Sequence, residues 1–334
     1  MTTRAYSARL GEISDAQFQH ALDRLDLGEL VRATAVPFGL FGQNVFLTTT
    51  RGEFIFRGAQ HGDWQFAKEV FFARLLAERT TVPVAWPQWL ETSPEIFGWS
   101  YILAPRLPGL PLADPQVIVG LSPDDRWQIA WALGETLAAL QTLTGEQAGD
   151  FDLAAGGVVP FEGGHLGHLV GEVRRLIADA DASGSLTRED HAWIEGVLRQ
   201  AGSARAAGPS VYLHNDFSLN NVLAERRDGA WAITGVVDLM TSAFGGGEAD
   251  LCRQAANYLD QDPALTSALI GAYRGAGGGG LDAQSRAPLY VVYERLLLWE
   301  YFTRPPQRAD WTAGKTFSGW ARRYVDRLTP LLST

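Results

Sequence analysis

Alternating apolar and polar residues run along two neighbouring segments near the start of the chain. Residues 45–50 read VFLTTT, residues 53–58 read EFIFRG, and Arg51-Gly52 separates them. Alternation with a period of two predicts β-strands, and a glycine-containing break between two such runs predicts a hairpin. The segments VPVAWPQWL at 82–90 and FGWSYILAP at 97–105 predict further strands, punctuated by proline. We therefore expect a small antiparallel sheet in this region.

A helical pattern follows the hairpin. Residues 63–79, DWQFAKEVFFARLLAER, place their apolar side chains on one helical face, and Glu69 falls on that same face. A carboxylate on an apolar stripe needs a partner. Arg57 at the end of the second strand is the partner we expect, and the alternative is a surface contact of Glu69 with Lys68 or Arg74.

Beyond residue 107 the periodicity is mainly helical. The helical patterns cover 122–143, 168–180, 187–202, 249–260, 263–275 and 286–302. Strands with one helix, followed by a longer helical part, predict an α+β fold with two lobes. We expect one lobe over residues 1–107 and a second, mainly helical lobe over residues 108–334.

One hairpin is predicted inside the helical part. Residues 222–225 are mostly apolar, Asp228-Gly229 follows, and WAITGVVD at 231–238 is a second β-like run. Asp-Gly between two such runs is a strong turn signal. The turn folds the chain back, so that Asp238 can lie beside Asn221.

The same segment holds a set of side chains suited to phosphoryl transfer. This reaction needs a carboxylate that orients and deprotonates the attacking hydroxyl, and an amide and a second carboxylate that hold Mg²⁺ on the phosphates. Asp216, Asn221 and Asp238 offer these groups in that order, and the spacing H-x-D-x-x-x-x-N begins at His214. We expect Asp216 to be the catalytic base and Asn221 and Asp238 to be the metal ligands.

Three stretches resemble the aminoglycoside phosphotransferase and choline kinase family. They are the HND of this loop, the VVDL that carries Asp238, and GGGEADLCR, which contains Asp250. The resemblance follows nearly the whole chain in order, and it is specific over residues 211–254. It implies a protein-kinase-like fold with a small antiparallel-sheet N-lobe and a mainly helical C-lobe. In such a fold residues 1–107 would be the nucleotide-binding lobe with its hinge, and residues 108–334 would be the catalytic and substrate-binding lobe. It also implies transfer of the γ-phosphoryl group of ATP to a hydroxyl of a small molecule.

The resemblance also implies positions for the nucleotide. Arg57 stands where the family places a lysine or arginine that contacts the α- and β-phosphates, and Glu69 would hold it. Alignment by the glycine of APRLPG assigns the contacts with the base to the Pro105 carbonyl and the Leu107 N–H. ATP is the expected nucleotide, with GTP possible and with Mg²⁺ as the metal.

A glycine-containing turn at residues 38–44 is a further candidate nucleotide contact. It includes Gly39, Gly42 and Asn44, and it runs into a predicted strand. Backbone N–H groups of such a turn can lie over phosphates. The alternative is that the two glycines serve an ordinary hairpin.

Composition limits the remaining possibilities. The chain has 334 residues, of which 46% are hydrophobic, and a single cysteine, Cys252, which leaves no basis for a disulfide framework or a cysteine-based zinc site. No apolar run approaches the length of a membrane span. We expect a cytoplasmic enzyme, monomeric or homodimeric, with a hydroxylated small molecule as partner and without nucleic acid or membrane partners.

Regional charge bears on the acceptor. Asp and Glu outnumber Lys and Arg by 18 to 8 in residues 109–240, whereas residues 241–334 hold 9 against 10 and are rich in aromatic residues. A polycationic aminoglycoside needs a strongly acidic site. The resemblance implies an antibiotic kinase, for a nucleoside-type or aminoglycoside antibiotic, and the charge distribution favours an acceptor with few positive charges. The alternatives are a metabolite kinase for choline, homoserine or a sugar, and a nucleotide-binding pseudokinase.

Overall fold

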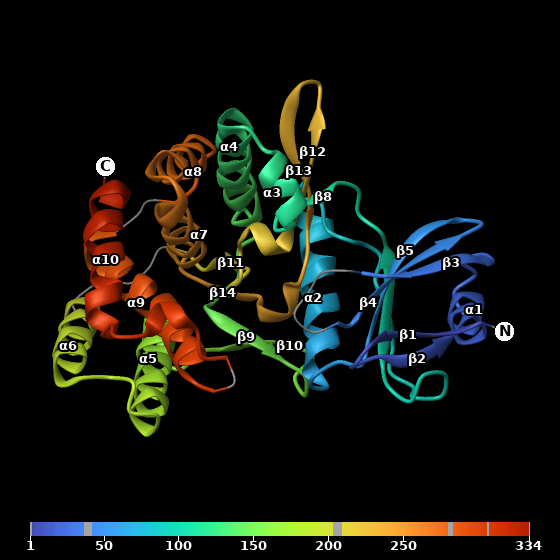
Figure 1. Cartoon of the computed structure of the whole chain (residues 1–334), viewed down its shortest axis with the longest axis horizontal. Coiled ribbons are helices and arrows are strands. Elements are labelled where there is room, and N and C mark those ends of the chain that lie inside the picture. Colours follow the sequence, from blue (N-terminus) through green and yellow to red (C-terminus); the bar gives the residue numbers. More distant parts are fainter. Residues whose placement is uncertain (1, 37–41, 203–208, 280–282, 306, 334) are drawn as a thin grey trace. The chain divides into compact units, whose positions relative to one another are not determined.

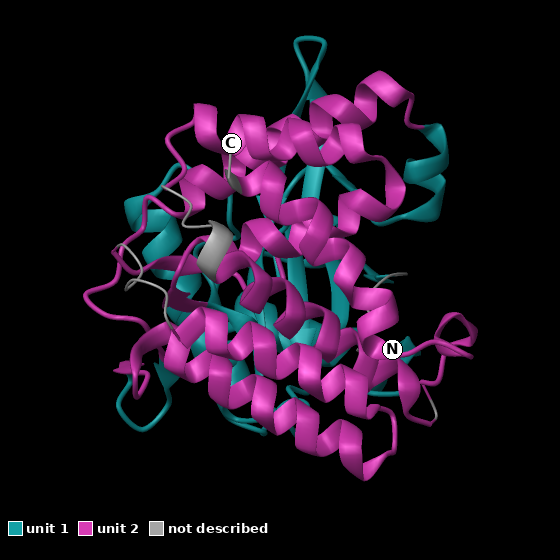
Figure 2. Ribbon diagram, turned by 90° about the vertical axis from the view of Figure 1, so that its left-hand side faces the viewer, with its two compact units in different colours: residues 1–120, 151–157, 219–242 teal, residues 121–150, 158–218, 243–334 magenta. Residues whose placement is uncertain are grey.

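A computed structural model describes residues 2–36, 42–202, 209–279, 283–305 and 307–333 of the chain. Contacts group the chain into two compact units, coloured separately in Figure 2. Unit 1 comprises Met1–Gly120, Phe151–Gly157 and Leu219–Ser242, and unit 2 comprises Leu121–Asp150, Val158–Ser218 and Ala243–Thr334. Because the units group segments by contact and not by chain order, the division into lobes at residue 107 stays a prediction.

Unit 1 is built on a five-stranded antiparallel sheet in the order β3-β4-β5-β7-β6. Figure 1 labels three of these strands, β3, β4 and β5. Its strands are β3 (Leu30–Ala35), β4 (Asn44–Thr49), β5 (Gly52–Gly58), β6 (Trp89–Glu91) and β7 (Tyr101–Pro105). The predicted hairpin is β4–β5, in which Asn44 pairs with Arg57. The sheet that the alternation predicts is therefore confirmed.

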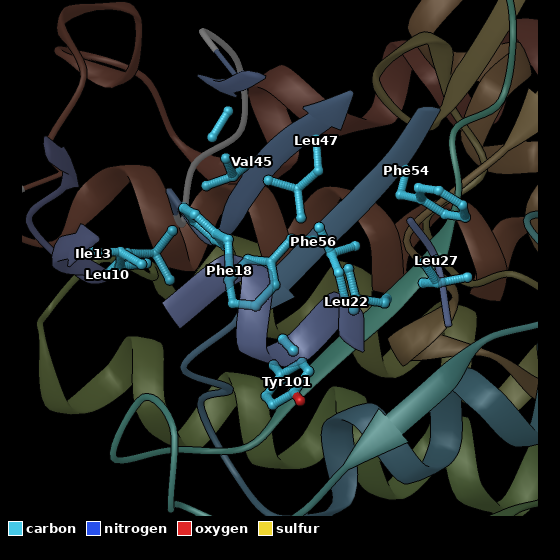
Figure 3. Packing of buried hydrophobic residues seen from close by; sticks show 13 residues of the cluster. Leu10, Ile13, Phe18, Leu22, Leu27, Val45, Leu47, Phe54, Phe56 and Tyr101 are labelled. Atoms are coloured by element: carbon cyan, nitrogen blue, oxygen red, sulfur yellow. The ribbon is translucent and has the colours of Figure 1, made fainter. Parts of the chain in front are cut away.

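One face of this sheet carries the main core of unit 1. A short hairpin of β1 (Thr3–Ser7) and β2 (Gly11–Ser14) leads into α1 (Asp15–Asp23), whose start is fixed by a capping box of Ser14 and Gln17. Phe18 of α1 is fully buried and meets the ring of Phe56 edge-on, with centroids 5.1 Å apart. Figure 3 shows the two rings among apolar side chains of the sheet.

The other face of the sheet packs against α2 (Trp64–Arg79), the helix predicted from residues 63–79. Phe66 of α2 lies against Ile102 and Ala104 of β7, with Ile55 of β5 beside them. Successive side chains of a strand point to opposite faces. Arg57, two residues after Ile55, is therefore directed to the same side of the sheet as α2.

Unit 1 also contains the predicted catalytic-loop hairpin. β12 (Val222–Arg227) and β13 (Ala230–Val236) are antiparallel, and β12 pairs on its other edge with β8 (Leu110–Pro111). Asp228 and Gly229 both have positive φ, 52° and 86°, which is the requirement of a tight two-residue hairpin turn. The remaining short helices of unit 1 are α3 (Pro115–Gly120), η1 (Leu219–Asn221) and η2 (Leu239–Thr241).

Unit 2 is mainly helical. Its helices are α4 (Pro123–Leu140), α5 (Gly164–Ala182), α6 (Arg188–Gly202), α7 (Glu248–Gln261), α8 (Pro263–Gly275), α9 (Ala283–Thr303), η3 (Asp310–Thr312) and α10 (Phe317–Ser333). A small sheet has the order β10-β9-β14-β11, formed by β9 (Gly149–Asp152), β10 (Gly157–Pro160), β11 (Val211–Leu213) and β14 (Ala243–Gly245). An antiparallel sheet followed by a mainly helical part confirms the α+β class.

Two features show how the helices of unit 2 pack. Gly134 of α4 lies so close to α8 that a Cβ atom there would be 2.3 Å from the carbonyl oxygen of Leu269. Three tryptophan rings pack together: Trp299 of α9, Trp311 of η3 and Trp320 of α10. The ring centroids of Trp311 and Trp320 are 4.7 Å apart. These C-terminal aromatic side chains therefore hold helices to one another. Among the described helices, none is long and apolar enough to cross a membrane.

Candidate active site

The ion pair predicted between β5 and α2 is present. Arg57 Nη1 contacts Glu69 Oε1, and the two side chains are only 14% and 4% exposed. Both neighbours named as alternative partners have aromatic contacts: Lys68 lies over the ring of Trp64 and Arg74 over that of Phe71. Arg57 is thus fixed by a carboxylate from the helix that covers its face of the sheet.

A second carboxylate reaches the same guanidinium. Asp238 follows β13, and its Oδ1 is 3.5 Å from Nη2 of Arg57. Its backbone has φ 63° and ψ 60°, a left-handed conformation that costs a non-glycine residue on the order of 1 kcal/mol and is concentrated at functional sites. The backbone N–H of Val237 donates to the carbonyl of Asn221 (3.0 Å), which places Asn221 beside Asp238.

Burial shapes the protonation of this cluster. It raises the pKa of Glu69 to about 7, and the charge of Asp238 adds to the rise, whereas the Arg57 guanidinium opposes it. The negative charges of Glu69 and Asp238 both stabilise the charged form of Arg57. The permanent cation of this cluster therefore lies between two acids, one of which can take up a proton near neutral pH.

These residues fit a magnesium ion. Asp238 Oδ1 is buried and, among the described residues, accepts no hydrogen bond. An amide oxygen from Asn221 and a carboxylate oxygen from Asp238 are hard ligands of the kind that Mg²⁺ takes, together with water and phosphate oxygens. The described part of the chain holds no group of three or more His, Cys, Asp or Glu side chains that could bind a metal by themselves. A site completed by phosphate is the type that these residues suit.

The end of β7 has the geometry expected of a base-binding segment. Arg106 donates its backbone N–H to Glu53 across the β5–β7 ladder (3.0 Å), so the adjacent pair containing Pro105 is of the non-hydrogen-bonded kind. The Pro105 carbonyl therefore points away from β5, towards the side of β6, whose pairing with β7 reaches only as far as Leu103. Leu107 packs its side chain against Gly235 of β13. Contacts of these two residues with a nucleotide stay a prediction.

The glycine-containing turn is described in part. Gly39 lies outside the described residues. Gly42 has φ 57°, and a Cβ atom there would be 2.9 Å from the Cβ of Ser7, so both conformation and space require glycine. Asn44 is directly opposite Arg57 on β4, and its side-chain oxygen is buried without a hydrogen bond to any described residue. The phosphate contacts expected of this turn stay a prediction.

The loop with Asp216 belongs to unit 2 and is anchored by Asp250 of α7. The carboxylate of Asp250 accepts the backbone N–H groups of His214 (2.7 Å) and Asn215 (2.9 Å). Burial raises the pKa of Asp250, and the interaction with His214 opposes this rise. The stretch GGGEADLCR, which carries the resemblance, therefore fixes the backbone of the loop just before Asp216.

Two site residues are not apparent in the sequence. Arg253 of α7 contacts Asp216 Oδ1 through Nη2 (2.5 Å), and its Nη1 contacts Glu294 of α9. The available signal was the position of Arg253, three residues after Asp250 and thus on the same face of a helix. Glu294 lies 41 residues further along the chain, where no local pattern marks it as a partner of Arg253.

A family model described as the phosphotransferase enzyme family matches residues 33–286, which is more than half of the chain. None of the curated proteins matches the chain.

Several solved structures share the fold. The GDP and kanamycin complex of APH(2″)-IIIa has a TM-score of 0.61 at 14% identity, with 96% of this chain and 97% of that chain covered. A thermostable mutant of aminoglycoside phosphotransferase APH(4)-Ia, in a ternary complex with ADP and hygromycin B, has a TM-score of 0.59 at 14% identity, with 93% and 97% covered. A protein of Ralstonia eutropha JMP134, provisionally assigned as an aminoglycoside phosphotransferase, gives 0.59 at 16%, with 96% of each chain covered. The predicted protein-kinase-like fold is thereby confirmed.

Proposed function

The chain belongs to the phosphotransferase enzyme family and is a small-molecule kinase, and we propose that it transfers the γ-phosphoryl group of ATP to a hydroxyl of an antibiotic. The observation that carries the proposal is the cluster in unit 1, where Asp238 lies in a left-handed conformation next to the buried pair of Arg57 and Glu69. Strained backbone conformations cluster at functional sites, and the forked guanidinium of arginine matches the geometry of phosphate oxygens.

Charge balance supports a metal-bound nucleotide at this cluster. With Glu69 ionised, the one cation of Arg57 faces two carboxylates, and the cluster has a net negative charge before any phosphate arrives. A polyphosphate brings further negative charge, so a divalent cation is needed between it and Asp238. Mg²⁺ bound by Asn221 and Asp238 would supply this neutralisation on the phosphate oxygens. Arg57, held by Glu69, would contact the non-transferred phosphates.

Asp216 takes the proton in the proposed reaction. The acceptor oxygen forms a bond to the γ-phosphorus while the bond from that phosphorus to the bridging oxygen of ADP breaks. The hydroxyl proton passes to the Asp216 carboxylate, so the products are ADP, a phosphate ester and a proton held on the enzyme. The anchoring of His214 and Asn215 by Asp250 supports this role, because it fixes the backbone that presents Asp216.

Neutralised carboxylates favour an acceptor with few positive charges. In unit 2, Glu294 is paired with Arg253, and the buried Glu248 is paired with the buried Arg286. Carboxylates that already hold a guanidinium contribute little net field to attract a polycation. We therefore favour a nucleoside-type or other weakly charged antibiotic over an aminoglycoside, although the structural neighbours named above are aminoglycoside enzymes.

The test is a direct assay of the reaction. Purified protein is incubated with MgATP, and separately with MgGTP, together with a panel of aminoglycosides, nucleoside-type antibiotics, choline, homoserine and sugars. The expected result is an antibiotic product heavier by one phosphoryl group, formed by the wild type and not by Asp216→Asn. Phosphorylation of a metabolite alone would move the proposal to the alternative. Nucleotide binding without any transfer would instead favour a pseudokinase, and transfer to kanamycin or hygromycin B alone would overturn the preference for a weakly charged acceptor.

A further inference from the structure

Arg253 joins two acidic side chains from different parts of unit 2. Its Nη2 contacts Asp216 on the loop, and its Nη1 contacts Glu294 on α9. The exposed fraction of the side chain falls from 36% for Asp216 to 20% for Arg253 and 9% for Glu294. The guanidinium therefore has a buried side, held by Glu294, and a more accessible side, which holds Asp216.

The anchoring of Arg253 makes it a rigid contact. An exposed arginine retains much of its rotamer freedom, so an exposed ion pair contributes little. Here Glu294 takes one terminal nitrogen of a side chain that is four-fifths covered, and the planar guanidinium then directs its other terminal nitrogen in a defined direction. Asp216 Oδ1 meets that nitrogen at 2.5 Å. The carboxylate is thereby restricted in rotation as well as in position.

α7 holds the loop at two neighbouring points. Asp250 accepts the backbone N–H groups of His214 and Asn215, and Arg253, one helical turn later, donates to Oδ1 of Asp216. The backbone bonds alone leave both side-chain dihedrals of Asp216 open, because they act before its Cα. A contact with Oδ1 is the additional constraint that an oriented base requires.

On these contacts, which rest on the proposed function for their catalytic meaning, we propose that Arg253 is a positioning residue. It orients the Asp216 carboxylate towards the acceptor hydroxyl, and Glu294 fixes Arg253 for that task. Arg253 itself contacts neither substrate nor nucleotide in this role. Its removal should therefore lower kcat while leaving the KM for ATP nearly unchanged.

The experiment compares Arg253→Ala, Arg253→Lys and Glu294→Gln with Arg323→Ala as matched control. Arg323 is an exposed arginine of the same unit, paired with Asp260 at 2.7 Å. We expect Arg253→Ala to lower kcat by about 10²-fold and added guanidinium chloride to restore part of it. Glu294→Gln should give a smaller loss of kcat, and the control none. A kcat of Arg253→Ala equal to that of the wild type, in a folded protein, would refute the assignment.

An assay that needs no turnover separates this proposal from the proposed function. Crystal structures of the wild type, Arg253→Ala, Arg253→Lys and Arg323→Ala are compared for the side-chain dihedral angles of Asp216. The carboxylate should leave its wild-type direction in Arg253→Ala, keep most of it in Arg253→Lys, and keep it in Arg323→Ala. An unchanged direction in Arg253→Ala means that the guanidinium does not orient Asp216. An absence of phosphotransfer in the wild type would overturn the proposed function, while this comparison would still decide the contact.

Discussion

At the scale of single residues, Asp216 is the side chain whose loss should separate chemistry from binding. Asp216→Asn keeps the size and the backbone anchoring of the loop but removes the carboxylate that we propose accepts the proton. We expect kcat to fall by about 10² to 10⁴ and the affinity for MgATP to stay close to that of the wild type. Asp228→Asn, at the hairpin turn, is the matched control and should leave kcat unchanged. Wild-type turnover in Asp216→Asn would remove this residue from the mechanism.

Glu69 predicts a pH dependence of stability. Its pKa in the folded protein is about 7, above the value of 4.5 for a free glutamate. Between these values the folded state binds more protons than the unfolded state, so the free energy of unfolding decreases as pH rises through this window. The size is on the order of 1 kcal/mol for each unit of pKa difference.

Glu69→Gln tests this dependence because glutamine does not titrate. The slope of unfolding free energy against pH between pH 5 and 7 should become less negative in the variant, whatever its absolute stability. Glu189→Gln removes a carboxylate that is 73% exposed and should keep the slope of the wild type. Equal slopes in all three proteins would show that Glu69 titrates in its ordinary range.

The residues that sequence analysis found and missed differ in how their partners are placed. Arg57 and Glu69 lie 12 residues apart, at the end of a strand and on the apolar face of the next helix, so periodicity located both side chains. The kinase-like motif further along the chain then favoured their pairing. Arg253 and Asp216 are 37 residues apart, and Glu294 comes from a third element. Only the packing of α7 and α9 unites these three residues, and packing is not encoded in any local pattern.

At the scale of elements, the catalytic-loop hairpin could be predicted from local sequence, whereas the start of one helix could not. β12 and β13 were predictable because Asp228-Gly229 supplies the two positive φ values that a tight turn requires. The start of α5 was not predictable, and the helix begins at Gly164, four residues before the predicted start. Its cap is Gly163 in a left-handed conformation without a side-chain hydrogen bond, and the preceding residue types carry no capping signal.

Gly134 gives a prediction about the packing of two helices. A methyl group there would overlap the backbone of α8, whereas Gly171 of α5 has no atom within 4 Å of the corresponding position. We expect Gly134→Ala to lower the free energy of unfolding by about 1–3 kcal/mol. Gly171→Ala should be neutral or raise it by up to about 1 kcal/mol, because alanine favours the helix. Chemical denaturation measures both, and equal effects would mean that α4 and α8 are not in close contact.

At the scale of the whole molecule, nucleotide binding should appear as stabilisation of the chain against heat. A ligand that binds only the folded state adds about 3 kcal/mol at a hundred times its Kd. If Asn221 and Asp238 hold Mg²⁺ on the phosphates, this gain depends on the metal. MgATP should raise the Tm of the wild type, and ATP with EDTA should raise it much less.

Two variants test which residues the stabilisation by MgATP depends on. Asp238→Ala removes the buried carboxylate oxygen next to Arg57 and should lose most of the rise in Tm with MgATP. Asp216→Asn leaves the unit 1 cluster intact and should keep the rise, although it cannot carry out the transfer. The two variants therefore distinguish loss of binding from loss of chemistry by one measurement. If MgATP stabilised Asp238→Ala as much as the wild type, the metal would have to be bound elsewhere, and the role proposed for Asp238 would be wrong.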